Sequence, residues 1–262
     1  MTNQPRSRFP VVDCARVPIA VCTPTEASAE VIRLALASKD RGVDVHLCNA
    51  YTLALADKSV AFLKVLQASS INFPDGKAVV WANKVRHRHL KLGSDRVYGP
   101  DLFLDVFLKG QDAGLRHYLL GSSPDVLERL RAELMHRFPS AHIQGSASPP
   151  YRPLTDDERH DQVRKIVNSK AHVIWVGLGT PKQDWESARL ASETEAVFVA
   201  VGAAFDFVAG VQRQAPRWMQ TSGLEWLYRL CAEPRRLWRR YLFGNVGFLA
   251  AAVRAGGRSK RR

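Results

Sequence analysis

One segment of the sequence presents a carboxylate that could act as a base. Asp75 stands in the run Asn72-Phe73-Pro74-Asp75-Gly76, between an apolar stretch and a stretch with helical periodicity. Pro, Asp and Gly in this order also favour a tight turn, and from this segment alone a plain turn is the more common explanation. The alternative is that Asp75 lies at a strand-to-helix junction, where its carboxylate can deprotonate a hydroxyl group.

A second segment, residues 177–183, has residue types that suit phosphate binding. Gly177-Leu178-Gly179-Thr180-Pro181-Lys182-Gln183 follows an apolar run and precedes a helical one. Glycines allow the backbone to approach a ligand, and the free N–H groups of a helix N-terminus attract anions. The segment is neither a Walker A loop nor a dinucleotide fingerprint. The alternative, equally weighted, is a helix start at which Thr180 and Gln183 form a capping box. The ligand contacts expected here are Gly179, Thr180, Lys182 and Gln183.

Alternating elements are expected to position these segments. Short runs rich in Val, Ile and Leu predict strands at 45–48, 117–121, 172–177 and 197–201. A helix-start signal at Thr23-Pro24 precedes the first of these strands, and others at Ser123-Pro124 and in the capping box at 155–158 fall between them. This alternation predicts an α/β fold: a Rossmann-like, mainly parallel sheet with helices on both faces. Ligands of such sheets bind where strand C-termini meet helix N-termini.

The positive charge is concentrated at the C-terminal end. The 262 residues carry a formal net charge of +13, of which residues 1–211 supply +3 and residues 212–262 supply +10. We therefore expect an α/β catalytic body over 1–211 and a basic helical appendage over 212–262 whose partner is anionic. An apolar content of 46% excludes global disorder, and the four scattered cysteines indicate free thiols.

The appendage is predicted to contain a basic amphipathic helix after Glu233-Pro234. Its expected apolar face carries Leu237, Trp238, Tyr241 and Leu242, with arginines between them. Aromatic anchors beside arginines are typical of a helix on an anionic membrane surface. The expected membrane contacts are Arg235, Trp238, Arg240, Tyr241 and Phe243. The alternatives are a helix that packs on the body with solvated arginines, and a basic nucleic-acid-binding protein, which a pI near 10.0 also suits.

Motifs for metal and nucleophile chemistry are missing from the sequence. It has no D-x-D pair to hold a metal–diphosphate, no metal-binding His or Cys spacing, and no G-x-S-x-G nucleophile elbow. No metal or other cofactor is therefore expected, and no stretch approaches the roughly 20 apolar residues of a membrane-spanning helix.

Taken together, these segments resemble the bacterial WecG/TagA/CpsF family, the N-acetylmannosaminyltransferase-like glycosyltransferase family 26. The likeness runs from about Val45 to Leu249. It rests on Cys48-Asn49-Ala50 and on residues 74–81, 96–102, 118–121 and 177–183. Most specific is Ala215-Pro216-Arg217-Trp218-Met219-Gln220, followed by residues 223–230 and 233–236.

The resemblance implies an inverting, metal-independent transfer of a hexose or N-acetylhexosamine from a UDP-sugar to a polyprenyl-diphosphate-linked sugar, in bacterial surface polysaccharide synthesis. It implies Asp75 as the general base. The substrate-binding residues that it implies are Asn49, Arg96, Gln183, Arg229, Arg236 and Arg239. Many members have Thr two residues before the motif Asn, where this chain has Leu47, so glucose is a candidate donor sugar beside N-acetylmannosamine.

The expected partners follow from that reaction. They are the UDP-sugar, the lipid-linked acceptor and the anionic inner-leaflet surface, with no nucleic acid. A basic tail beside a lipid substrate predicts a cytoplasmic protein, peripheral on the inner face of the cytoplasmic membrane. Self-association into a homo-oligomer is left open.

Overall fold

The structure, a computed structural model, describes residues 8–37, 40–90, 92–93 and 95–259. The side chains of His89, Arg236, Phe243, Val253 and residues 255–259 lie outside this description. The chain divides into two compact units, each assembled from separate stretches of sequence. Within the described part, the first unit contains residues 25–46 and 99–213, and the second contains residues 8–24, 47–98 and 214–259.

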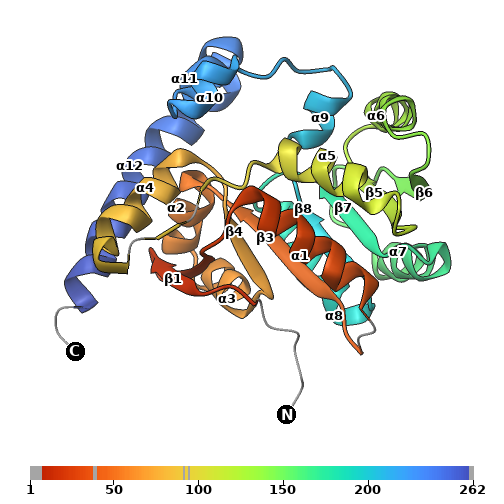
Figure 1. Cartoon of the computed structure of the whole chain (residues 1–262), viewed down its shortest axis with the longest axis horizontal. Helices are drawn as coiled ribbons and strands as arrows, with labels where there is room; N and C mark the ends of the chain where they lie inside the picture. Colours follow the sequence, from red (N-terminus) through yellow and green to blue (C-terminus); the bar gives the residue numbers. More distant parts are fainter. Residues whose placement is uncertain (1–7, 38–39, 91, 94, 260–262) are drawn as a thin grey trace. The chain divides into compact units, whose positions relative to one another are not determined.

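Strands and helices alternate through most of the chain (Figure 1). The strands are β1 (Val11–Cys14), β2 (Val17–Ala20), β3 (Val43–Cys48), β4 (Ile71–Pro74), β5 (Arg116–Gly121), β6 (His142–Ala147), β7 (Val173–Gly177) and β8 (Val197–Ala200). The first helices are α1 (Pro24–Leu36), α2 (Ala50–Lys58), α3 (Val60–Ala68), α4 (Lys77–Arg86), the 3-10 helix η1 (Arg88–Leu90), α5 (Gly99–Gly110) and α6 (Pro124–Arg137). The remaining helices are α7 (Asp156–Ser169), α8 (Lys182–Glu193), α9 (Ala204–Val208), α10 (Arg217–Thr221), α11 (Glu225–Ala232) and α12 (Pro234–Ser259).

The main sheet has six strands in the order β4-β3-β8-β7-β5-β6. The pairs β3–β8, β7–β8, β5–β7 and β5–β6 are parallel. In this register Trp175 of β7 stands opposite Val199 of β8 and Leu119 of β5. The four predicted strands correspond to β3, β5, β7 and β8, so the expected α/β class with a mainly parallel sheet is confirmed.

Strand β7 shows why the sheet of the first unit is apolar on both faces. The ring of Trp175 meets the ring of Phe103 on α5 edge-on, with centroids 4.8 Å apart. The neighbouring Ile174 and Val176 belong to a different buried cluster, which includes Ile166 of α7 and Leu190 of α8. Because successive side chains of a strand point to opposite faces, helices cover both sides of this sheet.

The second unit has its own core, to which the C-terminal helix contributes. The antiparallel hairpin β1–β2, which the sequence analysis does not identify, supplies Ile19. Leu53 of α2 and Leu66 of α3 pack in the same cluster as Phe248 and Ala251 of α12. Figure 1 shows α12 as a long blue helix alongside α2, the helix it packs against. Residues after 213 therefore share a core with residues from the first hundred, and a self-sufficient body over 1–211 stays a prediction.

Candidate active site

Asp75 lies at the junction between strand β4 and helix α4. Strand β4 ends at Pro74, Gly76 caps α4 with a φ of 109°, and α4 begins at Lys77. The Asp75 N–H donates to the carbonyl of Cys48 at the end of β3, at 2.9 Å. The carbonyl of Pro74 accepts from the N–H of Val97, at 2.8 Å. A glycine suits the left-handed backbone at position 76, and the backbone bonds fix the aspartate beside it.

The surroundings of Asp75 hold its pKa close to neutrality. Burial and the nearby Glu225 carboxylate raise this pKa to about 6, while Arg96, a hydrogen bond from Asn49 and Arg229 oppose the rise. A carboxylate with a pKa near the working pH is ionised often enough to act and basic enough to accept a proton. Of the two alternatives for this segment, the raised pKa favours a carboxylate that can deprotonate a hydroxyl group over a plain turn.

Asn49 links Asp75 to helix α2. Its side-chain oxygen caps that helix by accepting from the backbone N–H of Thr52 at 3.1 Å. The same oxygen accepts from the Thr52 hydroxyl at 3.3 Å. Its amide nitrogen remains to serve the Asp75 carboxylate. The structure therefore gives Asn49 a role in orienting the base, and its contact with substrate stays a prediction.

Arg96 is held by the C-terminal part of the chain. Its Nη1 donates to Oε2 of Glu225 at 2.6 Å, and the two side chains are only 10% and 14% exposed. Its Nη2 donates to the amide oxygen of Gln220 at 3.5 Å, and its guanidinium lies 4.2 Å from the ring centroid of Tyr98. Glu225 is not among the site residues predicted from the sequence, although it stands in the family-like segment 223–230.

Asp75, Asn49, Arg96, Glu225 and Arg229 are called the Asp75 centre below. Arg240 also interacts electrostatically with Asp75, although the sequence predicts Arg240 as a membrane contact. Its guanidinium lies 4.7 Å from the ring centroid of Tyr51. Its Nε is buried without a hydrogen-bond partner among the described residues. Burial lowers the pKa of Arg240, and the charges of Arg229 and Asp75 also act on it. A half-buried cation with a buried spare donor is suited to an anion.

The other predicted tail residues are dispersed. Arg235 and Arg239 are exposed, and the guanidinium of Arg239 lies 5.2 Å from the ring centroid of Trp238. Tyr241 is half-buried, with its ring centroid 6.0 Å from that of Trp226. The side chains of Arg236 and Phe243 lie outside the described residues.

Helix α12 has two apolar faces, and this corrects the single face expected from the sequence. Leu237 is buried, whereas Trp238 is 43% and Leu242 is 56% exposed. Val246 and Leu249 continue the exposed row at helical spacing. The four side chains grouped by the sequence analysis therefore divide between the core and the surface. None of the helices in the described ranges has the length and apolar character needed to cross a bilayer.

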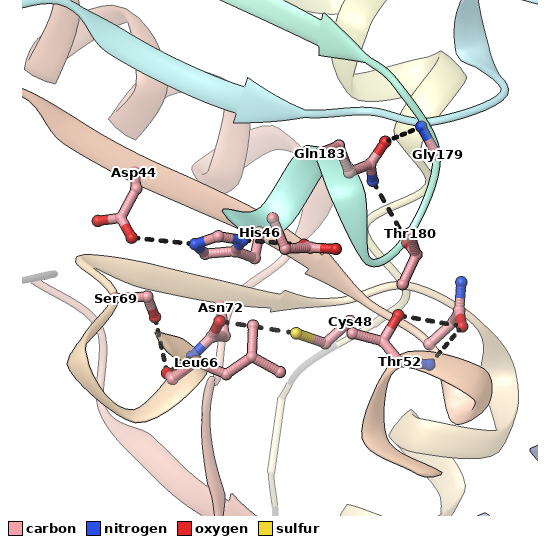
Figure 2. Close-up of polar contacts among 12 residues, drawn as sticks. Asp44, His46, Cys48, Thr52, Leu66, Ser69, Asn72, Gly179, Thr180 and Gln183 are labelled. Carbon is pink, nitrogen blue, oxygen red and sulfur yellow. Dashed lines mark hydrogen bonds and ion pairs between the residues drawn. The ribbon is translucent and has the colours of Figure 1, made fainter. Parts of the chain in front are cut away.

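The loop at 177–183 lies in the first unit and folds around its own glutamine. Oε1 of the buried Gln183 accepts from the N–H of Gly179 at 3.1 Å, and Nε2 donates to the Thr180 hydroxyl at 3.5 Å (Figure 2). The expected capping box is absent from this described loop, because α8 begins only at Lys182 and Gln183 bonds within the loop. Lys182 is exposed and donates to the carbonyl of Pro150 at 3.4 Å.

A buried histidine ties the first turn of α8 to strand β3. The Nδ1 of His46 lies 2.9 Å from Oδ1 of Asp184, and its Nε2 lies 3.0 Å from Oδ2 of Asp44 (Figure 2). Burial opposes the charge, but the bonds to Asp184 and Asp44 outweigh it and raise the pKa of His46 to about 9. The sequence analysis misses this cluster. The spacing of Asp44 and His46 on one face of a strand is the signal that was present.

This cluster predicts that the protein loses stability at mildly alkaline pH. The folded pKa of His46 exceeds the ordinary value near 6.5, so its contribution is complete below that value and disappears as the pH rises through about 9. We expect the free energy of unfolding, measured by urea denaturation, to fall by roughly 2–3 kcal/mol between pH 6.5 and 9. His46→Gln should be less stable and lack most of this fall, whereas His136→Gln, at an exposed position on α6, should keep it. If the free energy of unfolding of His46→Gln fell by as much as that of the wild type, the pH dependence would come from another group.

The fold is of the α/β class, and its strand-to-helix junction presents the carboxylate of Asp75 beside cationic groups. This combination would suit the activation of a hydroxyl next to an anionic group. The chain belongs to the glycosyl transferase WecG/TagA/CpsF family, whose model matches residues 12–262. It is therefore a glycosyltransferase, of a family that acts in cell-surface polysaccharide synthesis.

Proposed function

We propose that this protein transfers a hexose or N-acetylhexosamine from a UDP-sugar to a polyprenyl-diphosphate-linked sugar, with inversion, at the inner surface of the cytoplasmic membrane. The observation that carries this proposal is the half-buried Asp75, which has a pKa of about 6 and interacts electrostatically with Arg96, Arg229 and Arg240. Transfer from a diphosphate-activated sugar requires a base that accepts the proton of the acceptor hydroxyl, and it requires cations that stabilise the departing diphosphate.

The bond changes of the proposed reaction require one role from Asp75 and another from the arginines near it. The acceptor hydroxyl oxygen attacks the anomeric carbon and forms the new glycosidic bond, while the bond from that carbon to the diphosphate oxygen breaks. The hydroxyl proton passes to the Asp75 carboxylate. A single attack from the face opposite the leaving group inverts the anomeric configuration. Asp75 needs no covalent sugar intermediate in this sequence.

The departing diphosphate gains negative charge, which the arginines are placed to stabilise. Arg240 has the spare buried donor, and Arg229 lies within electrostatic reach of the same aspartate. Guanidinium groups bind phosphate oxygens through two parallel N–H bonds. We assign Arg240 to this task rather than to the membrane. The loop that contains Gly179 and Gln183 is proposed to bind the donor, because it has two glycines and leads into the N-terminus of α8.

One residue bears on the identity of the donor sugar. Leu47, near the end of β3, is buried and has no hydroxyl with which to bond a sugar. Where a relative with Thr at this position could recognise a polar substituent, this chain cannot. Glucose and N-acetylmannosamine therefore both remain candidate donor sugars.

The exposed row on α12 supports attachment to the bilayer that carries the acceptor. Trp238, Leu242, Val246 and Leu249 offer apolar side chains to the surface, and Arg235 and Arg239 add exposed positive charge. Apolar side chains together with cations bind anionic lipid surfaces.

Donor and acceptor are tested with a panel of UDP-sugars against polyprenyl-diphosphate-linked acceptors, in the presence of EDTA. We expect one UDP-hexose or UDP-N-acetylhexosamine to support transfer, EDTA to have no effect, and the product linkage to be inverted. A retained anomeric configuration, or activity that EDTA removes and a divalent cation restores, would contradict the mechanism. Salt-sensitive binding of duplex DNA, without transfer or affinity for anionic vesicles, would favour the nucleic-acid alternative.

A further inference from the structure

The Asp75 centre contains a second carboxylate, which is supplied by the C-terminal segment. Glu225 is the first residue of α11, and its ion pair with Arg96 is almost fully buried. Arginine has five N–H donors, of which Glu225 and Gln220 occupy two in the recorded contacts. These two bonds therefore fix the plane of the Arg96 guanidinium, and its remaining N–H groups can donate to a ligand.

The backbone before Glu225 is shaped to seat this carboxylate. Gly223 has a φ of 79°. A Cβ placed on it would lie 2.7 Å from a ring carbon of Trp81 and 3.3 Å from the Cβ of Lys77, both on α4. Only a glycine permits so close an approach with that backbone conformation. Gln220 adds a second tie, because its amide donates to the carbonyl of Ala215 at 2.8 Å while its oxygen accepts from Arg96.

Charged, titratable and hydrogen-bonding groups from several segments act on Asp75. They are Asn49 at the start of α2, Arg96 and Tyr98 before α5, Glu225 and Arg229 on α11, and Arg240 and Tyr241 on α12. Most of the charges in this set are positive and favour an ionised, weakly basic aspartate. Glu225 is the one acid in the set, and it acts in the opposite direction on the pKa of Asp75.

We infer that Glu225 is a positioning residue for the proposed base: its ion pair orients Arg96 and offsets the charge of that guanidinium beside Asp75. This inference rests on the proposed role of Asp75 as the base. It adds that the C-terminal segment supplies the carboxylate that tunes the base, as well as cations for the leaving group.

The pH dependence of kcat/KM tests this role, because kcat/KM reports the ionisation of the free enzyme. The wild-type rate should fall on the acid side with a midpoint near pH 6, the pKa of Asp75. In Glu225→Gln the midpoint should move down by about 0.5 pH or more, since a like charge has been removed. In Arg96→Gln it should move up, because an opposite charge has been removed. Glu133→Gln, which removes a carboxylate from an exposed ion pair on α6, should leave it unchanged.

A role limited to structure would lower the rate at every pH without moving the midpoint, and that result overturns the inference. A single variant could misfold because it leaves one charge of the ion pair without its partner. The Arg96→Gln/Glu225→Gln double variant removes both charges and so controls for this effect. Its midpoint should lie between those of the single variants. The titration of Asp75, followed by carboxyl 13C NMR, should shift in the same directions without reference to turnover. Normal turnover in Asp75→Asn would overturn the proposed function itself, whereas an unshifted Glu225→Gln midpoint overturns only this inference.

Discussion

Replacing Asp75 by Asn should abolish sugar transfer while the protein remains folded. Asparagine has the size of aspartate but cannot accept the acceptor proton, so kcat should fall by about 10²–10⁴-fold. The ionised form of Asp75 is disfavoured by desolvation and by Glu225, so its removal should leave the free energy of unfolding nearly unchanged or slightly higher. Transfer is measured with the donor identified in the panel, and folding by circular dichroism and urea denaturation.

Measuring UDP binding distinguishes a variant that has lost only the catalytic step from one whose binding site is damaged. Asp75→Asn should bind UDP with nearly wild-type affinity in calorimetry, because the substitution leaves the residues proposed to bind the diphosphate unchanged. Asp125→Asn, at an exposed position in the first turn of α6, is the matched control and should keep full turnover. Turnover within a few-fold of wild type in Asp75→Asn would remove this residue as the base.

Replacing Trp238 and Leu242 together by serine should detach the protein from anionic vesicles. Both side chains lie on the exposed row of α12. Each loses apolar area that a bilayer would otherwise cover, so affinity for vesicles that contain phosphatidylglycerol should drop by at least about tenfold. Turnover on a long-chain polyprenyl acceptor in vesicles should fall with it, while turnover on a short, soluble acceptor should persist.

A matched pair of exposed apolar residues in the first unit serves as the control. Trp185 is 41% and Val167 is 55% exposed, close to the values for Trp238 and Leu242. Trp185→Ser/Val167→Ser should leave vesicle binding unchanged. If both double variants lose affinity equally, the row on α12 is not the lipid contact. Deleting α12 would be a poorer test, because its other face places Phe248 and Ala251 in the core of the second unit.

Local sequence patterns predicted much of the fold. The runs of Val, Ile and Leu found the strands at the centre of the sheet, since buried parallel strands are apolar throughout. Ser123 and the Thr155–Glu158 pair form the predicted caps, with Ser123 accepting from the N–H of Val126. The Thr180 capping box failed because its glutamine found a partner two residues outside the helix.

The parts that the sequence did not predict depend on contacts between distant residues. A period of 3.6 residues marks both apolar rows of α12 but does not say that Leu237 faces the core and Trp238 the surface. The pairing of His46 with Asp184, and of Arg96 with Glu225, joins segments far apart in the chain. Asp75 could be proposed as the base from the family resemblance, whereas the carboxylate that tunes its pKa could not.

The division of the second unit into three stretches has a consequence for its synthesis. Asp75 leaves the ribosome long before Glu225, Arg229 and Arg240, and the core around Leu53 and Leu66 lacks Phe248 until residue 248 has been added. Growing chains can complete the parallel pairs of the first unit while this core is still open. Asp75 therefore acquires Arg96 early and Glu225, Arg229 and Arg240 late, and chains that terminate before residue 225 carry Asp75 without these three groups.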